Sequence, residues 1–166
     1  MNNSKTLTPK GYLFKLSIIH AGSSFAILLF TIVIFLMNKE VVLGFTENKG
    51  LLIYIVPIVC MIAYFGTNYF FNQELKNMVQ HKSLKKKLLQ YQKGCIIRFA
   101  ILEGAVFLSS TSFMITNNIF YLVISILLIL YLIKLKPTKK TLVRDLNFSM
   151  VEKQKFQEGN NPLEDD

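Results

Sequence analysis

The sequence predicts an all-α integral membrane protein, a four-helix bundle of two antiparallel hairpins with short amphipathic helices on the cytoplasmic side. Hydrophobic residues make up 52% of the 166-residue chain. They gather in four long blocks instead of alternating with polar residues, and most basic residues lie between or beyond these blocks. Each block approaches the roughly 20 residues that a helix needs to cross a hydrocarbon core of about 30 Å.

The transmembrane domain is predicted to cover residues 1–136. Its spans are expected at about residues 13–37, 51–71, 96–115 and 119–135. The first block is too long for a secretory signal peptide, and no small-residue cleavage site follows it. Only "TNN" separates the last two blocks, so they should form a tight antiparallel hairpin. The second helix of this hairpin reaches residue 135 if Lys134 extends its amine to the membrane interface.

The placement of charge predicts the orientation of the chain. The net charge is +9, and seven basic residues lie between the second and third blocks, with seven more after the fourth. The first connection balances Lys39 and Lys49 with Glu40 and Glu47, and "TNN" carries no charge. By the positive-inside rule, both termini and a basic loop at 72–95 are cytoplasmic. This topology explains the positive charge without a nucleic-acid partner.

The basic loop at 72–95 allows two interpretations. Leu84, Leu88 and Tyr91 recur at i, i+4 and i+7, which is typical of a helix that lies on an anionic membrane surface. The residues expected to contact anionic lipid headgroups are Lys82, Lys85, Lys86 and Lys87. A solvated loop that only fixes the orientation of the chain explains the same residues equally well.

Residues 137–166 are predicted to form a cytoplasmic amphipathic tail. Thr138 can cap a short helix that carries Leu142 and Leu146, and "SMVE" has the spacing of a capping box between Ser149 and Glu152. The acidic end, "EGNNPLEDD", is expected to be disordered.

One carboxylate, Glu103, interrupts the third apolar block, within "RFAILEGAVF". An unpaired charge in the membrane core costs at least roughly 2.5 kcal/mol, so a partner, a cavity or a proton is expected there. Helical spacing puts Glu103 on a stripe of small and polar residues that includes Gly104 and Ser110, the composition of a helix contact in lipid.

The first block carries a matching polar stripe, Ser17, His20 and Ser24, with Gly22 close by. Glycines favour close helix approach, so we expect the first and third helices to cross at Gly22 and Gly104 and to bring His20 against Glu103. The second helix adds polar lining at Tyr64 and Asn68. The fourth is nearly featureless and is expected to face lipid.

Two roles for the His20 and Glu103 pair remain open. The pair could share a titratable proton on a proton or cation pathway, or it could be a buried hydrogen-bonded contact that fixes the register of two helices. Enzymatic activity, a metal site and a cofactor are not expected, because the sequence lacks HExxH, GxSxG and phosphate-binding glycine motifs. Cys60 and Cys95 have no ligand or redox spacing.

The segments "AILEGAVF" and "LKPTKKTLVRDL" resemble a group of small bacterial four-helix membrane proteins without an established activity. In that group a Leu-Glu-Gly motif in helix three precedes a Lys/Arg-Pro-Thr element and an Asp-Leu pair, here Lys136-Pro137-Thr138 and Asp145-Leu146. The resemblance implies the four-helix architecture and singles out Glu103 and Gly104. We expect a protein of the bacterial inner membrane.

Rotary ATPase proteolipids are distantly similar, as hairpins with one membrane carboxylate, but they have a dense glycine repeat that this chain lacks. Small multidrug transporters carry their glutamate on the first helix. We therefore expect a non-enzymatic accessory component or scaffold of a membrane assembly, self-associating or bound to another membrane protein. The alternative is a proton- or cation-coupled transporter or channel subunit that uses Glu103.

Overall fold

The computed structural model describes residues 8–38, 40–42, 50–78 and 83–157, and every regular element in these residues is a helix. The six helices are α1 (Pro9–Met37), α2 (Leu52–Met78), α3 (Leu84–Thr116), α4 (Ile119–Lys134), α5 (Lys139–Asp145) and α6 (Met150–Gln157). The prediction of an all-helical fold is confirmed. The acidic end at 158–166 lies outside the described residues.

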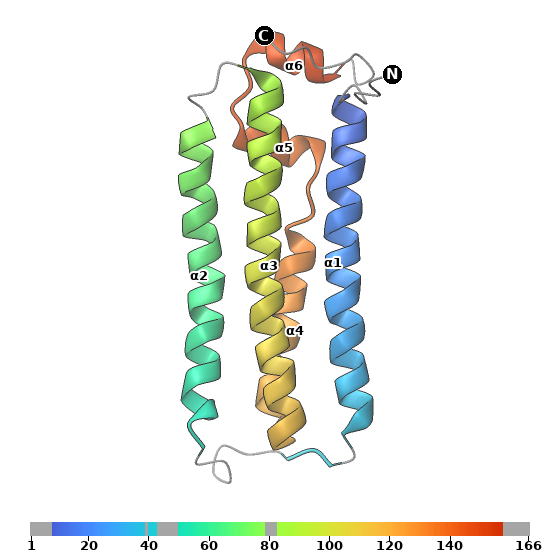
Figure 1. Cartoon of the computed structure of the whole chain (residues 1–166), viewed down its shortest axis with the longest axis vertical. Coiled ribbons are helices and arrows are strands. Elements are labelled where there is room, and N and C mark those ends of the chain that lie inside the picture. The colour runs from blue at the N-terminus through green and yellow to red at the C-terminus, as the bar shows by residue number, and fades with distance from the viewer. Residues whose placement is uncertain (1–7, 39, 43–49, 79–82, 158–166) are drawn as a thin grey trace, which may run out of the picture.

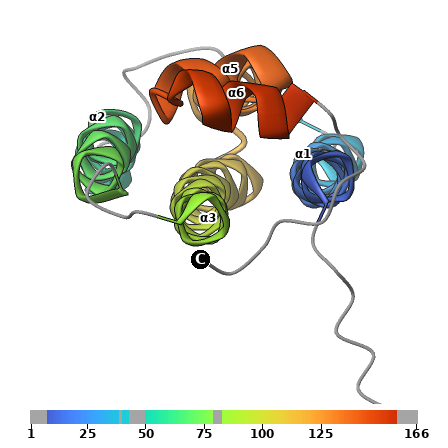
Figure 2. The ribbon, with the colours of Figure 1, turned by 90° about the horizontal axis from the view of Figure 1, so that it is seen from above.

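The long helix α3 is the centre of the bundle. Seen from above, α1 and α2 lie on opposite sides of α3, and α4 lies behind it (Figures 1 and 2). The predicted α3–α4 hairpin is present and closely packed. Helices α1 and α2 follow one another in the chain and run in opposite directions, but α3 separates them, so they do not pack together as a hairpin.

Three helices, α1, α2 and α3, are long and apolar enough to cross a membrane. Helix α4 has 16 residues, which gives about 24 Å at 1.5 Å per residue. It passes the same test only together with α5, from which it is bent by 83°. The described part of the chain therefore has three or four helices that could span a membrane.

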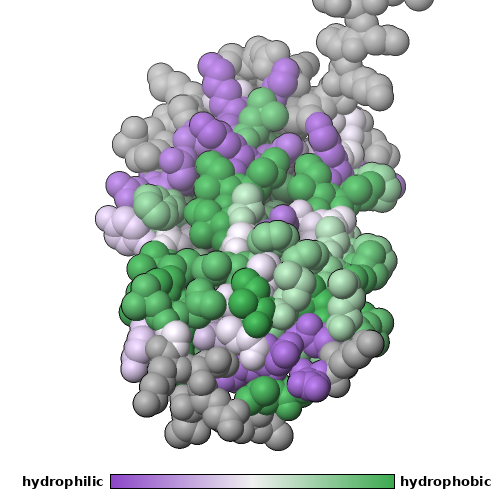
Figure 3. All heavy atoms as spheres, turned by 60° about the horizontal axis from the view of Figure 1, so that its bottom comes forward, coloured by the Kyte–Doolittle hydropathy of each residue, from purple (hydrophilic) through white to green (hydrophobic). Residues whose placement is uncertain are grey.

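The outer walls of these four helices are apolar. Large hydrophobic side chains remain exposed on each of them, for example Phe25, Ile62, Phe107 and Leu127, which are between 52% and 66% exposed. Figure 3 shows apolar side chains over the helical walls, with hydrophilic side chains gathered mainly toward the end that carries α5 and α6. Such a surface suits contact with lipid better than contact with water.

The turn between α3 and α4 explains why two residues, Asn117 and Asn118, suffice to reverse the chain. Asn117 adopts the left-handed conformation, with φ of 55°, and its N–H donates to Phe113 O at 2.8 Å. Asn118 then caps α4 with its side chain. The α1–α2 connection closes on this turn, because Val42 N–H donates to Asn117 O at 2.9 Å and Val42 O accepts from Ile119 N–H at 3.2 Å.

The two predicted helix caps of the tail are confirmed. Thr138 Oγ1 accepts from Thr141 N–H at 3.1 Å at the start of α5. In the capping box that begins α6, Ser149 N–H donates to Glu152 Oε2 at 2.8 Å, and Glu152 N–H donates to Ser149 Oγ at 3.2 Å. These side chains satisfy amides that the first turn of a helix leaves without a backbone partner.

The predicted loop at 72–95 is instead mostly helical, because α2 continues to Met78 and α3 begins at Leu84. Leu88 and Tyr91 are buried, as are Leu142, Leu146, Phe148 and Phe156 of the tail, so the apolar stripe faces protein and the predicted helix on the membrane surface is wrong. We call this packed end, made of the first two turns of α3 with α5 and α6, the basic cap.

Candidate functional site

His20 does not meet Glu103, so the predicted pair is wrong. The imidazole is 4% exposed, and its Nε2 lies 2.9 Å from Leu132 O in α4. A carbonyl oxygen only accepts, so Nε2 carries the proton in this contact. The ring also packs edge-on against Phe99 with centroids 4.9 Å apart. His20 therefore ties α1 to the last turn of α4, where Leu132 O also accepts from Leu135 N–H at 3.0 Å.

Glu103 is half-buried, and its Oε1 atom is buried without a hydrogen-bond partner. The hydroxyl of Ser24 on α1 is buried and unpartnered in the same way. One turn before Glu103, Phe99 contacts His20; one turn after it, Phe107 stacks on Phe30 of α1 at 4.6 Å. Glu103 thus lies on the face of α3 that packs against α1.

Ser110 belongs to a run of hydroxyls in the middle of the bundle. Its Oγ lies 3.0 Å from Thr31 Oγ1 of α1 and donates to Ser125 Oγ of α4 at 3.0 Å. Ser125 Oγ in turn lies 3.0 Å from Tyr121 O. These contacts form one chain of hydrogen bonds from α1 through α3 to α4. The hydroxyl of Ser110, which was predicted as polar lining, is therefore bonded to other side chains of the bundle.

A second polar cluster surrounds Arg98. The guanidinium donates from Nη2 to Asn68 Oδ1 and, at 2.9 Å, to Tyr131 OH, which itself donates to Asn68 Oδ1 at 2.8 Å. The guanidinium carbon also lies 4.8 Å from the centroid of the Phe71 ring. The Tyr64 ring packs on Tyr131 at 4.5 Å. Arg98 therefore joins α2, α3 and α4, an arrangement that compensates for partial burial of its charge.

Tyr131 and Ser125 were not predicted as site residues, because α4 was expected to face lipid. In the structure, Tyr121, Ser125, Ile129 and Leu132 of α4 are buried. Tyr121, Ser125 and Tyr131, at i, i+4 and i+10, were the available signal, but an apolar helix with few polar residues gives no indication of which face is buried.

Neither predicted packing glycine makes a close helix contact within the chain, so this prediction is wrong. A Cβ atom added at Gly22 or Gly104 would meet nothing within 4 Å. Gly104 instead lines an outward-facing groove of about 300 Å³ between α2 and α3, together with Gly66, Ala63 and Ala105. Ser17, the last predicted lining residue, is half-buried.

The four lysines predicted to contact lipid do not form one exposed patch. Lys82 lies outside the described residues, and Lys87 forms an ion pair with Glu152 at 2.7 Å in which both side chains are at most 15% exposed. Lys85 is half-buried and interacts with another group, whereas Lys86 is exposed. Other exposed basic residues flank the bend between α4 and α5: Lys134, Lys136, Lys139, Lys140 and Arg144.

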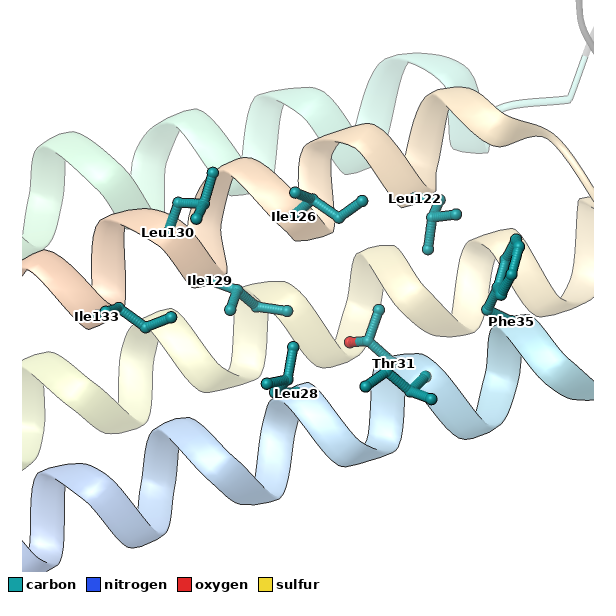
Figure 4. Close-up of a pocket in the computed structure, with 9 residues that line it drawn as sticks. Leu28, Thr31, Phe35, Leu122, Ile126, Ile129, Leu130 and Ile133 are labelled. Carbon is teal, nitrogen blue, oxygen red and sulfur yellow. The ribbon is translucent and has the colours of Figure 1, made fainter.

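A groove between α1 and α4 encloses about 350 Å³. Figure 4 shows Leu28, Thr31 and Phe35 of α1 facing Ile126 and Ile129 of α4 across it, in a wall completed by other leucines and isoleucines. The Thr31 hydroxyl is already engaged with Ser110. The groove therefore offers apolar contact to lipid chains and no polar group with which to recognise a solute.

Comparison of the chain with protein-family models, curated proteins and solved structures finds no match. The described residues contain no group of three or more His, Cys, Asp and Glu side chains that could hold a metal ion.

Proposed function

We propose that the chain is a non-enzymatic four-span protein of a bacterial cytoplasmic membrane, with both termini and the basic cap on the cytoplasmic side. The apolar walls of α1 to α4 and the exposed basic residues at the α4–α5 bend support this orientation. Because α4 spans only about 24 Å, Lys134 and Lys136 at its end extend toward anionic headgroups.

Within that membrane, we propose that the chain works as an accessory component that associates laterally with a second copy of itself. The α2–α3 groove is the observation that carries this proposal. Gly66 and Gly104 lie open at its floor, while Ile62 and Phe70 beside it are 65% and 59% exposed. One surface thus carries both a small-residue hollow and protruding side chains, as a two-fold contact between identical helices requires.

Replacement of Gly104 by leucine tests this association against a matched control. Gly22 is likewise a helical glycine with nothing near its Cβ position, but it lies on α1, away from the α2–α3 groove. In vesicles, energy transfer between two labelled populations should fall for Gly104→Leu and stay unchanged for Gly22→Leu. Equal transfer for both variants, or none in the unaltered protein, would refute self-association through this groove.

A proton- or cation-coupled role around Glu103 is the second candidate function. It is favoured by the buried and unpartnered Oε1 atom of Glu103, since a structural role as half of a hydrogen-bonded pair with His20 is no longer available. A proton- or sodium-dependent flux in reconstituted vesicles that Glu103→Gln abolishes, with unchanged expression and melting, is the expected result for this candidate.

A further inference from the structure

The groove between α1 and α4 has walls whose positions are fixed by polar contacts. Toward the basic cap, His20 of α1 contacts the Leu132 carbonyl of α4 at 2.9 Å. Deeper in the bundle, Thr31 of α1 is linked to Ser125 of α4 through Ser110 of α3, in two contacts of 3.0 Å each. These contacts hold the two helices at a defined spacing, so the groove is already formed without an occupant.

The lining of this groove selects an apolar occupant. Apart from Thr31, whose hydroxyl is bonded to Ser110, every residue that lines it is a leucine, isoleucine or phenylalanine. Side chains of α1 and α4 face each other across it (Figure 4). An empty space of about 350 Å³ would be unfavourable, because lining atoms without neighbours lose their dispersion contacts. In a membrane, lipid chains are the apolar groups that can fill it.

The length of the groove matches one leaflet of a bilayer. Its α4 wall runs from Leu122 to Ile133. At 1.5 Å per residue this run is about 16 Å long, close to half of a hydrocarbon core of about 30 Å. Because Ile133 lies next to the end of α4, the groove ends on the side of the basic cap. It therefore covers the depth of a single acyl chain.

Lysines gather at this end of the groove. Lys134 follows Ile133 directly, and the amide of Lys136 donates to the Ile133 carbonyl at 3.3 Å, so the backbone of Lys136 stays close to the groove after α4 ends. Lys139 and Lys140 begin α5 immediately beyond the bend. All four lysines are exposed, and no carboxylate in the described part of the chain forms an ion pair with any of them.

This charge discriminates between occupants of the groove. An anionic headgroup would meet unpaired ammonium groups, each of which contributes about a factor of five to binding, whereas a zwitterionic headgroup has no net charge to offer them. A second copy in the same orientation would bring its own four lysines to the same depth, so like charges would face one another. We propose that the groove and these lysines form a binding site for one anionic diacyl phospholipid, with one acyl chain along the groove and the phosphate at Lys134 and Lys136.

The proposal deepens the proposed function, because it names a lipid that the membrane-embedded chain binds. It rests on the bundle lying in a bilayer, but neither on its orientation nor on self-association, whose proposed surface lies between α2 and α3. Flotation of the protein with vesicles is therefore measured first. A protein that does not float refutes the proposed membrane location and with it the site, whereas a protein that floats but binds no phospholipid refutes the site alone.

Native mass spectrometry of the full-length protein in mild detergent measures the binding, with phosphatidylglycerol and phosphatidylcholine of identical acyl chains as probes. We expect one phosphatidylglycerol per chain, held at least tenfold more tightly than phosphatidylcholine. Lys134→Gln combined with Lys136→Gln should weaken phosphatidylglycerol binding about 25-fold, by two factors of about five. The matched control, Lys76→Gln combined with Lys93→Gln, removes two other exposed lysines, on α2 and α3, and should leave the affinity unchanged.

A second pair of variants tests the groove itself. Ile126 lines it, whereas the next residue, Leu127, is exposed on the outer wall of α4. Ile126→Trp fills the groove and should weaken phosphatidylglycerol binding at least tenfold, since displacement of two methylene groups already corresponds to about that factor. Leu127→Trp adds the same side chain outside the groove and should leave the affinity unchanged.

Equal binding of the two phospholipids, equal affinities of the two double lysine variants, or equal affinities of Ile126→Trp and Leu127→Trp would each overturn the proposal. A dimer that excludes phospholipid and is lost in Ile126→Trp would overturn it in favour of a second copy in the groove.

Discussion

The ion pair between Lys87 and Glu152 should hold the tail onto α3, and its loss should release α6 without unfolding the spans. The Nζ to Oε1 distance is 2.7 Å, and the side chains are 12% and 15% exposed. Breaking a fully buried pair by removing one partner costs about 3 to 5 kcal/mol, whereas an exposed pair contributes at most about 1 kcal/mol. This partly exposed pair should lie between these limits, at about 2 kcal/mol.

Two variants separate the ion pair from the capping box. Glutamine can replace glutamate in a capping box, so Glu152→Gln should keep the contact with Ser149 while it removes the charge that Lys87 binds. Lys87→Met and Glu152→Gln should cost about the same, because each leaves the other charge partly buried without its partner. Arg144→Gln is the control, since Arg144 pairs with Asp145 but its side chain is 76% exposed.

Hydrogen exchange of the α6 amides in lipid nanodiscs measures the local opening. A loss of about 2 kcal/mol corresponds to roughly 30-fold faster exchange, since 1.4 kcal/mol is a factor of ten. The α6 amides should exchange faster in both ion-pair variants, while exchange in α2 and in the middle of α3 stays unchanged. Equal exchange in Lys87→Met and Arg144→Gln would show that the ion pair does not hold the tail.

The same contact makes the tail sensitive to acid. Burial raises the pKa of Glu152, but hydrogen bonds from the Lys87 ammonium and from Ser149 outweigh it, and the net effect is a lowered pKa. A carboxyl with a lowered folded-state pKa stabilises the fold at any pH above its ordinary value, about 4.3, and loses this contribution as the pH falls through the lowered value. The protection factors of the α6 amides, which correct for the intrinsic pH dependence of exchange, should therefore fall below pH 4 in the unaltered protein and change less with pH in Glu152→Gln.

Substitutions at three further positions test the spans and the turn between α3 and α4. The stability of each variant is measured by thermal or denaturant unfolding in detergent. Asn117→Ala should destabilise the protein by about 1 kcal/mol because of the left-handed backbone at φ of 55°, whereas Asn117→Gly should not; equal losses would contradict this turn. Ser125→Ala removes one hydrogen bond between helices and should cost about 0.6 kcal/mol, and a loss above 2 kcal/mol would point to a larger role. Arg98→Met should destabilise the protein more than Arg98→Lys, because Nη2 alone donates to both Asn68 and Tyr131 and a lysine ammonium can donate two hydrogen bonds from one nitrogen; equal losses would refute this.

Local chemistry made much of the fold predictable. Blocks of apolar residues predict where the spanning helices lie, because their lengths match the hydrocarbon core. The α3–α4 turn and both tail caps follow from residue types that suit one backbone position, as with Asn117, Thr138 and Ser149. These signals act within a few residues, so no knowledge of the neighbouring helices is needed.

The helix contacts could not be predicted in the same way. In an apolar segment every face is hydrophobic, so the pattern does not reveal that α4 buries Ser125 or that Leu132 supplies the carbonyl for His20. Equal depth of His20 and Glu103 was correct to within one turn, but depth does not determine which helix a side chain meets. The glycines were misleading for the same reason, since Gly22 and Gly104 lie on outward faces.

The extension of α3 to Leu84 depends on contacts that are distant in sequence. Leu88 and Tyr91 are buried in the same core as Leu142 and Phe156, and Tyr91 OH donates to Asp145 Oδ2 at 3.2 Å. A lysine-rich segment is compatible with loop, surface helix and bundle helix alike. Only the docking of the tail selects the bundle helix.

We propose a topology in which four helices, including the short α4, cross the membrane and leave both ends of the chain on the cytoplasmic side. Cysteine substitutions at the exposed residues Glu40, Lys86 and Lys140, made in a Cys60→Ala, Cys95→Ala background, test it directly. A membrane-impermeant maleimide added to right-side-out vesicles should label the variant at position 40 and leave those at positions 86 and 140 unlabelled until the membrane is opened. Labelling at position 140 without labelling at position 86 would show that α4 does not cross the membrane, and would contradict the four-span topology.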